Sequence, residues 1–188
     1  MSHALVIVDM IKDNVNLSRG SALDNEAGKI IPNINQLIET FRSTAKPIIF
    51  ACDSFMEGDF IFGGKMRPHA IRGSGGDLPI DELNADPSDT ILLKRRMSAF
   101  HKTDLDQTLR TWKIETVAVC GIMTNVCVLL TALDAIQNDF NTVIVSDASA
   151  CYKPELHEMT LKIYENSALN PLFRIMSANE MISEIERG

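Results

Sequence analysis

Five short apolar runs with little polar alternation recur along the chain, and they constrain its fold more than any other feature. The runs cover residues 4–9, 47–51, 90–93, 116–120 and 142–146. Short uninterrupted runs of this kind are typical of strands that are buried on both faces of a parallel sheet. A further apolar run at residues 172–176 is a candidate sixth strand.

Helical patterns fill the segments between these runs. Apolar residues recur at helical spacing over residues 30–41, 105–112 and 128–136. Further helices are expected to start at Pro154 and after Ser177, where Glu180 completes a capping-box pattern. This alternation predicts a single domain over residues 1–188 with an α/β fold: three layers (α/β/α) around a central, mostly parallel, Rossmann-like sheet.

Charge and cysteine content narrow the expected partners and compartment. The formal net charge of −7 argues against a nucleic acid or an anionic membrane as a partner. No apolar stretch is long enough to span a bilayer. The four cysteines are widely spaced and form no CxxC pair, which argues against a disulfide framework. A reduced, cytoplasmic protein is therefore expected.

Five polar or reactive side chains stand at the expected carboxyl ends of strands, where functional groups gather in an open α/β sheet. They are Asp9, Asp53, Lys94, Cys127 and Asp147, which is expected to end the fifth strand. A sulfur nucleophile, a carboxylate that takes and returns its proton, and a cation that holds the charge are the set that amide hydrolysis uses. The sequence therefore predicts a hydrolytic site at this edge of the sheet.

Cys127 is the candidate nucleophile. Thr124 is the predicted N-cap of the helix that follows the strand ending at Cys120, so Cys127 is expected in the first helical turn. Unpaired N–H groups and the helix dipole favour a thiolate there. The alternative is a small, buried structural cysteine, and position alone does not decide between the two.

Three segments in order resemble the isochorismatase-like cysteine hydrolases, which include nicotinamidases and N-carbamoylsarcosine amidases. They are VIVDM at residues 6–10, KRRMSAF at 94–100, and GIMTNVCV at 121–128 continuing to TALDA at 131–135. The resemblance extends over nearly the whole chain and implies an isochorismatase-like fold. It also implies a homo-oligomer, either a dimer or a tetramer.

The same resemblance assigns roles to single residues. It implies Cys127 as the nucleophile, Asp9 as the general acid and base, and Lys94 as the orienting cation. It further implies a non-proline cis peptide bond between Ile122 and Met123. The N–H groups of Met123 and Cys127 would then form the oxyanion hole.

A departure from the nicotinamidases concerns their metal site. Asp53 matches the first ligand of their Asp-x-His motif and His69 resembles the last ligand, but Phe55 stands where a histidine is expected. Two ligands fall short of the three protein groups that zinc normally takes. We therefore expect that no cofactor is required, and a divalent metal such as zinc at Asp53 and His69 stays an alternative.

A second departure concerns the substrate pocket. Asn14 stands where nicotinamidases usually have Phe, which removes an aromatic wall and favours a smaller or more polar amide. Asn14, Phe55 and Phe100 are expected to line the pocket.

These patterns predict a cysteine-dependent amidohydrolase that cleaves a small amide or an N-carbamoyl (ureido) substrate through a thioester. Two alternatives stay open. One is isochorismatase-type hydrolysis of a vinyl ether, which needs no thiol. The other is a non-catalytic oligomer that binds a small molecule. Rapid alkylation of Cys127 relative to the other cysteines would favour the enzyme.

Overall fold

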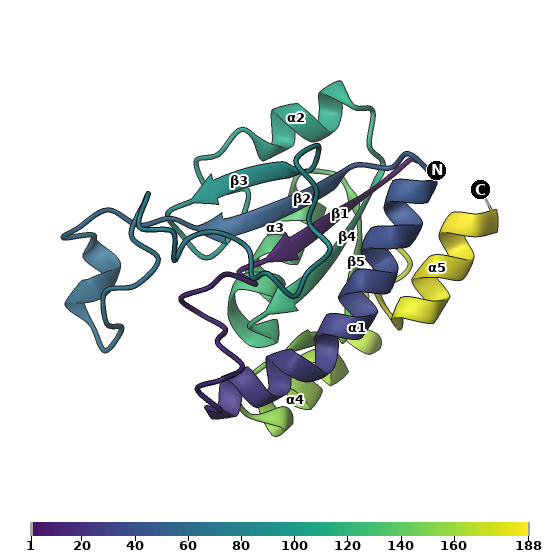
Figure 1. The fold of residues 1–188 in the computed structure, drawn as a ribbon. Coiled ribbons are helices and arrows are strands. Elements are labelled where there is room, and N and C mark those ends of the chain that lie inside the picture. Colours follow the sequence, from purple (N-terminus) through teal and green to yellow (C-terminus); the bar gives the residue numbers. More distant parts are fainter. Residues whose placement is uncertain (1, 188) are drawn as a thin grey trace.

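A parallel sheet forms the centre of the molecule (Figure 1). The computed structural model describes residues 2–187, so the predicted domain limits at 1 and 188 lie outside the described range. Within that range the six strands are ordered β3-β2-β1-β4-β5-β6, and every neighbouring pair is parallel. The strands are β1 (His3–Val8), β2 (Ile48–Asp53), β3 (Thr90–Lys94), β4 (Thr116–Ile122), β5 (Asn141–Ala150) and β6 (Phe173–Met176). The prediction of a mostly parallel sheet is confirmed.

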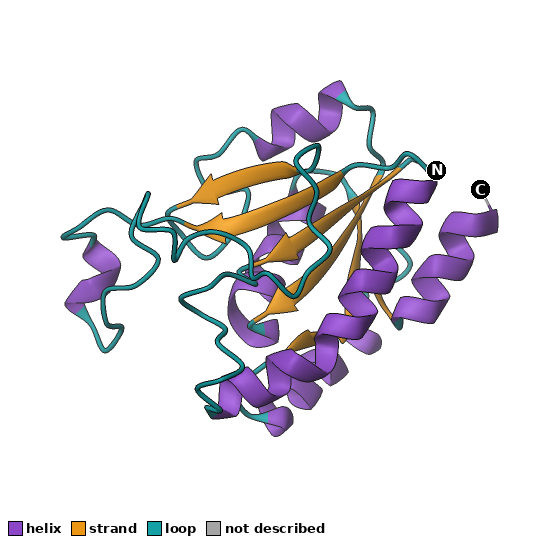
Figure 2. Cartoon of the chain, viewed as in Figure 1, coloured by secondary structure: helices purple, strands orange, loops and turns teal. Residues whose placement is uncertain are grey.

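Helices cover both faces of this sheet (Figure 2). On one face, residues of α1 (Ala22–Ser43) and α5 (Ala178–Arg187) share a core with the side chains of Leu5 and Ile7. On the other face, α2 (Leu105–Thr111), α3 (Leu129–Gln137) and α4 (Pro154–Glu165) share a second core with Val6 and Val8. Successive residues of a strand point to opposite faces, so a continuous apolar run supplies both cores. The three-layer prediction is confirmed.

The end of one strand differs from the sequence-based expectation, and the start of the last helix agrees with it. β5 continues past residue 146 to Ala150, because the register with β4 shifts and Ser149 pairs with Gly121. Asp147 is consequently exposed within this strand instead of ending it. The capping box at Ser177 is present, with Glu180 accepting from the Ser177 N–H at 2.7 Å and donating its own N–H to Ser177 Oγ.

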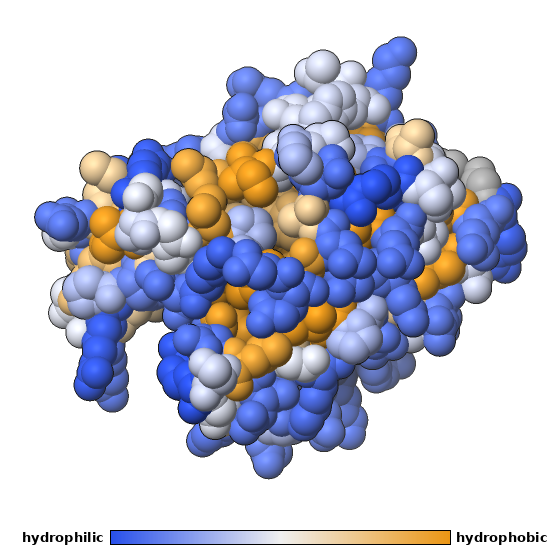
Figure 3. Space-filling model, in the orientation of Figure 1, coloured by the Kyte–Doolittle hydropathy of each residue, from blue (hydrophilic) through white to orange (hydrophobic). Residues whose placement is uncertain are grey.

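A long connection between β2 and β3 extends away from the sheet and contains a short 3₁₀ turn, η1 (Phe60–Gly63) (Figure 1). Asp13 fixes part of it, since its carboxylate accepts the backbone N–H of Ala70 at 2.7 Å. The face shown in Figure 3 is largely hydrophilic, with patches of hydrophobic residues between hydrophilic ones. No helix among residues 2–187 is long and apolar enough to cross a membrane.

Candidate active site

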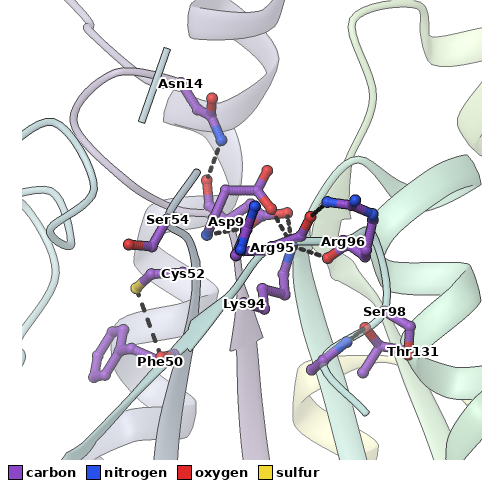
Figure 4. A network of polar contacts seen from close by, with 12 residues as sticks. Asp9, Asn14, Phe50, Cys52, Ser54, Lys94, Arg95, Arg96, Ser98 and Thr131 are labelled. Atoms are coloured by element: carbon purple, nitrogen blue, oxygen red, sulfur yellow. Dashed lines mark hydrogen bonds and ion pairs between the residues drawn. The ribbon is translucent and has the colours of Figure 1, made fainter. Parts of the chain in front are cut away.

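A buried lysine joins two carboxylates at the carboxyl edge of the sheet (Figure 4). The Nζ of Lys94 lies 2.8 Å from Oδ2 of Asp9 and 2.6 Å from Oδ1 of Asp53, and it also donates to the carbonyl of Arg96. The other oxygen of Asp9 accepts the backbone N–H of Asp53 at 2.9 Å. Buried charges are tolerated when they are paired and hydrogen-bonded in this way.

Backbone geometry at the strand ends explains why these groups meet. Asp53 and Lys94 are register partners at the ends of β2 and β3, so their side chains leave the sheet at the same level. Asp9, just beyond β1, has a left-handed φ of 54°, a conformation that Asp adopts more readily than most residues. Beside it, Gly121 has φ 108°, and a Cβ there would lie 2.2 Å from the carbonyl oxygen of Val8. Only glycine permits this close approach of β4 to β1.

Cys127 reaches the same point from the segment after β4. It lies in a π-helical turn, η2 (Thr124–Val128), which leads into α3. Ligand-type atoms of Cys127, Asp9 and Asp53 all lie within 4.8 Å of one another. The Ile122–Met123 peptide bond that precedes the turn is cis. The structure therefore brings the thiol, the two carboxylates and the lysine together at one buried edge.

Charge and burial set the protonation states of this group. Burial is the largest effect on Cys127 and raises the pKa of its thiol well above the usual value; the charge of Asp9 adds to this and the charge of Lys94 opposes it. For Lys94, burial alone would lower the pKa, but Asp9, Cys127 and Asp53 together raise it. The expectation of a resting thiolate is therefore wrong: dehydration and nearby carboxylates outweigh the lysine and the helix end. Lys94 remains an ammonium.

A small cavity of about 100 Å³ opens above this cluster. Asp9, Asp53 and Cys127 belong to its lining, and Asn14 is also there with its side-chain amide donating to the Asp9 carbonyl. The remaining walls are mostly apolar and come from helix α1, the long connection and the loop after β3: Leu23, Met66, His69, Met97, Ile122, Met123 and Val126. Methionine side chains adapt their shape readily, so these walls can adjust to a ligand.

Two expected pocket residues lie elsewhere. Phe55 is fully buried and packs edge-on against His69 and Phe62, behind the cavity wall. Phe100 packs against Phe140 in the core between the sheet and the α2–α3 layer. The placement of Phe55 and Phe100 in the lining is therefore wrong, because both rings are taken up by apolar packing. Asn14 is in the lining as expected.

The residues present do not fit the metal site that the sequence left open at Asp53 and His69. Among residues 2–187, the group of three ligand-type side chains close enough to hold an ion is Asp9, Asp53 and Cys127, without His69. The His69 ring instead packs edge-on against Phe55, and its Nδ1 is 2.9 Å from the carbonyl of Arg67. Both carboxylates of the three-residue group already bind the Lys94 ammonium. The Lys94 ammonium therefore already binds the carboxylate oxygens that a metal ion would need as ligands.

The contacts that hold the π-helical turn were missed from the sequence. Thr124 was the predicted N-cap, but the N-cap is Met123 and Thr124 is the first residue of the turn. Its Oγ1 instead lies 2.8 Å from Nδ1 of His157 on α4. His157 is half-buried. Asp53 was also missed as a partner of Lys94, although its place at the end of the strand next to β3 was a usable signal.

Comparison with known proteins agrees with this architecture. The chain is 32% identical over 168 residues to the uncharacterised isochorismatase family protein YwoC of Bacillus subtilis, covering 85% of this chain and 83% of that protein. It is 30% identical over 178 residues to the ureidoacrylate amidohydrolase RutB of Pantoea ananatis, covering 81% and 70%.

Solved structures give the same result. The crystal structure of N-carbamoylsarcosine amidase from Thermoplasma acidophilum superposes with a TM-score of 0.80 at 29% identity, covering 95% of this chain and 98% of that one. The pyrazinamidase of Pyrococcus horikoshii, solved in complex with zinc, superposes with a TM-score of 0.79 at 28% identity, covering 94% and 99%.

A parallel α/β sheet whose carboxyl edge gathers a thiol, an acid and a lysine has the architecture of a cysteine hydrolase. The isochorismatase domain model matches residues 3–175. The chain therefore belongs to the isochorismatase family, whose members are hydrolases and include amidohydrolases that act on C–N bonds.

Proposed function

We propose that this chain is a cysteine-dependent amidohydrolase that cleaves a small amide or N-carbamoyl substrate. One observation carries the proposal: Cys127 lines the cavity beside Asp9, whose carboxylate is held by Lys94. Each of the three groups has a role in acyl transfer to sulfur. Vinyl-ether hydrolysis would leave the thiol without a role.

The first half-reaction transfers the acyl group to the enzyme. Because the raised pKa keeps Cys127 a thiol at rest, Asp9 takes its proton as the sulfur attacks the carbonyl carbon. The oxyanion is stabilised by the backbone N–H groups of Met123 and Cys127, at about 3 kcal/mol of barrier per donor. Asp9 then protonates the leaving nitrogen as the C–N bond breaks, which leaves a thioester, or the corresponding thiocarbamate of a ureido substrate.

The second half-reaction releases the product. Asp9 takes a proton from water, the hydroxide adds to the carbonyl carbon of the thioester, and the C–S bond breaks. The sulfur regains its proton from Asp9, which restores the resting state. Lys94 stays charged throughout and compensates the negative charge that alternates between Asp9 and Cys127.

The cavity favours a small substrate. Its volume is about 100 Å³, and the methionines of its wall let it adjust to a ligand. Asn14 places a polar side chain in the lining at the position where nicotinamidases usually have Phe. This favours a ureido or amide group over a flat ring. The similarity to a ureidoacrylate amidohydrolase and to an N-carbamoylsarcosine amidase supports an N-carbamoyl substrate.

Ammonia release tests this function. The panel contains nicotinamide and several N-carbamoyl amino acids, and each compound is assayed with the wild type and with Cys127→Ala. We expect release from at least one N-carbamoyl compound with the wild type, and none with the variant. Cys52→Ala is the matched control, because this cysteine is also buried but lies outside the cavity lining. Turnover that survives Cys127→Ala would refute the mechanism.

We also infer a homo-oligomer that acts in the cytoplasm without a required metal. Met159 and Ile163 support self-association, because they are 62% and 67% exposed one turn apart on α4. Sedimentation of the wild type and of Met159→Lys tests the inference: a lower mass for the variant is expected, and a monomeric wild type would contradict it.

A further inference from the structure

The turn that carries the nucleophile is held from behind by two side chains of the β5–α4 region. Oγ1 of Thr124, which is fully buried, lies 2.8 Å from Nδ1 of His157. One residue further on, the thiol of Cys151 donates to Oδ1 of Asn125 at 3.1 Å. Both contacts join the first residues of η2 to segments more than 25 positions away in the sequence.

Neither His157 nor Cys151 belongs to the cavity lining. Both line a separate pocket of about 330 Å³, which α1, the end of β5 and the start of α4 enclose. Charged groups of that pocket that accompany His157 are Glu26 and Lys29 of α1 and Asp147 of β5. His157 therefore cannot act on a substrate directly, and any effect on catalysis must pass through Thr124.

Thr124 is well placed to pass on such an effect. It directly follows Met123 and begins the turn whose fourth residue is Cys127. Oxyanion donors work only when they lie within about 2.7–3.1 Å of the developing charge. A displacement of about 1 Å is enough to slow such a reaction strongly. A hydrogen bond that fixes Thr124 therefore fixes both backbone donors.

We propose that His157 is a positioning residue for acyl transfer, holding the Met123–Cys127 turn in place through its hydrogen bond with Thr124. The proposal rests on the function inferred above, because it assumes that this turn stabilises an oxyanion. It concerns the backbone donors and leaves the nucleophilicity of the sulfur unchanged.

Acylation by p-nitrophenyl acetate tests the proposal without knowledge of the natural substrate. Attack of Cys127 on the ester carbonyl forms an acetyl thioester and releases p-nitrophenolate, whose first turnover is followed by absorbance. Wild type, His157→Leu and His157→Asn are compared, and Cys127→Ala gives the background. Asn places a polar side-chain atom near the position of the histidine Nδ1, whereas Leu fills the space without a hydrogen bond.

We expect His157→Leu to slow acylation about tenfold, less than the roughly 10²–10³-fold loss that follows removal of an oxyanion donor. His157→Asn is expected to retain most of the wild-type rate. Alkylation of Cys127 by iodoacetamide passes through no oxyanion, so its rate should stay unchanged in both variants. Lys162→Gln, an exposed change on the same helix, is the matched control and should behave as wild type.

Three results would overturn the proposal. They are an unchanged acylation rate in His157→Leu, equal losses in the Leu and Asn variants, and a parallel loss of acylation and alkylation, which would indicate general loosening of the site. Failure of the proposed function gives a different pattern: no compound of the panel is hydrolysed, while Cys127 is still acylated by the ester. A wild type that the ester does not acylate would overturn both proposals.

Discussion

Lys94 and Arg95 are neighbours in the sequence, and carboxylates bind both, but the two ion pairs stand in opposite surroundings. The Lys94 side chain is fully buried between Asp9 and Asp53. The Arg95 side chain is 48% exposed, and its guanidinium binds Asp59 through Nε at 3.1 Å and Nη2 at 2.6 Å. Similar distances therefore accompany very different degrees of contact with water.

The difference lies in what happens when one partner is removed. Water and salt screen an exposed pair, so the remaining charge is solvated and little stability is lost. A buried charge that loses its partner keeps its desolvation penalty. Lys94 should therefore matter for folding as well as for chemistry, whereas Arg95 contributes little to stability. The Arg174–Glu184 pair, with side chains 25% and 21% exposed, lies between these extremes.

Lys94→Met is expected to have the largest effect. The change leaves Asp9 and Asp53 buried without their cation, and breaking a buried pair in this way costs about 3–5 kcal/mol of unfolding free energy. Urea unfolding at neutral pH, followed by circular dichroism, measures the loss. The double variant Lys94→Met/Asp53→Asn removes one uncompensated carboxylate and should recover part of it. If the unfolding free energy of Lys94→Met lies within about 1 kcal/mol of the wild-type value, the buried pair contributes no more to stability than an ordinary surface pair.

Asp53→Asn tests the same cluster through pH. Burial, and then the charge of Asp9, raises the pKa of Asp53 to about 7. The folded protein thus keeps a proton that the unfolded chain loses near pH 4. The stability from this proton is present below about pH 4 and is lost as the pH rises through about 7. The variant should therefore show a steeper rise or a smaller fall in unfolding free energy between these limits.

The unfolding free energies of wild type and Asp53→Asn are measured by urea unfolding at a series of pH values between about 4 and 7. Asp81→Asn serves as the control, since that carboxylate is 86% exposed and forms an ion pair with Lys12. Identical pH profiles for wild type and Asp53→Asn would mean that Asp53 is ionised in the folded protein well below pH 7.

Glu184→Gln should give an effect of intermediate size and of opposite sign in pH. The hydrogen-bonded Arg174 guanidinium lowers the pKa of Glu184 to about 2. The contribution of this carboxylate is present above the unfolded pKa near 4.3 and is lost as the pH falls towards 2. The difference in unfolding free energy between wild type and variant should shrink as the pH falls across this interval. Unfolding curves recorded at a series of acidic pH values measure it. Glu186→Gln, an exposed change on the same helix, should leave the profile unaltered.

Arg95→Gln is expected to have the smallest effect. Its partner Asp59 has a side chain that is only 2% exposed, but this carboxylate keeps the hydrogen bond from the Met56 N–H and the ion pair with Arg96 at 3.5 Å, and the lost charge of Arg95 is near solvent. The melting temperature should fall far less than in Lys94→Met, and the small difference should shrink further at high salt. A loss comparable to that of Lys94→Met would show that exposure is a poor guide to the strength of these pairs.

Much of the fold follows from local patterns. The strands were predicted from apolar runs to within a few residues, because burial on both faces leaves a clear signal. The end of β5 was not predicted, because the polar residues 146 and 147 interrupt the apolar run. The strand nevertheless continues through a shifted register with β4. Thr124 fits an N-cap by residue type, but its hydroxyl has a partner on α4 that no local pattern can reveal.

The sequence by itself determined which chemical groups stand at the strand ends, because strand ends are encoded locally. Asp9, Lys94 and Cys127 were all found in that way. The tertiary structure alone decided their state. Burial makes the resting sulfur a thiol, and a lysine ammonium occupies the carboxylate oxygens that a metal would need. Dehydration and distance between segments far apart in the chain set protonation and pairing, and only folding fixes both.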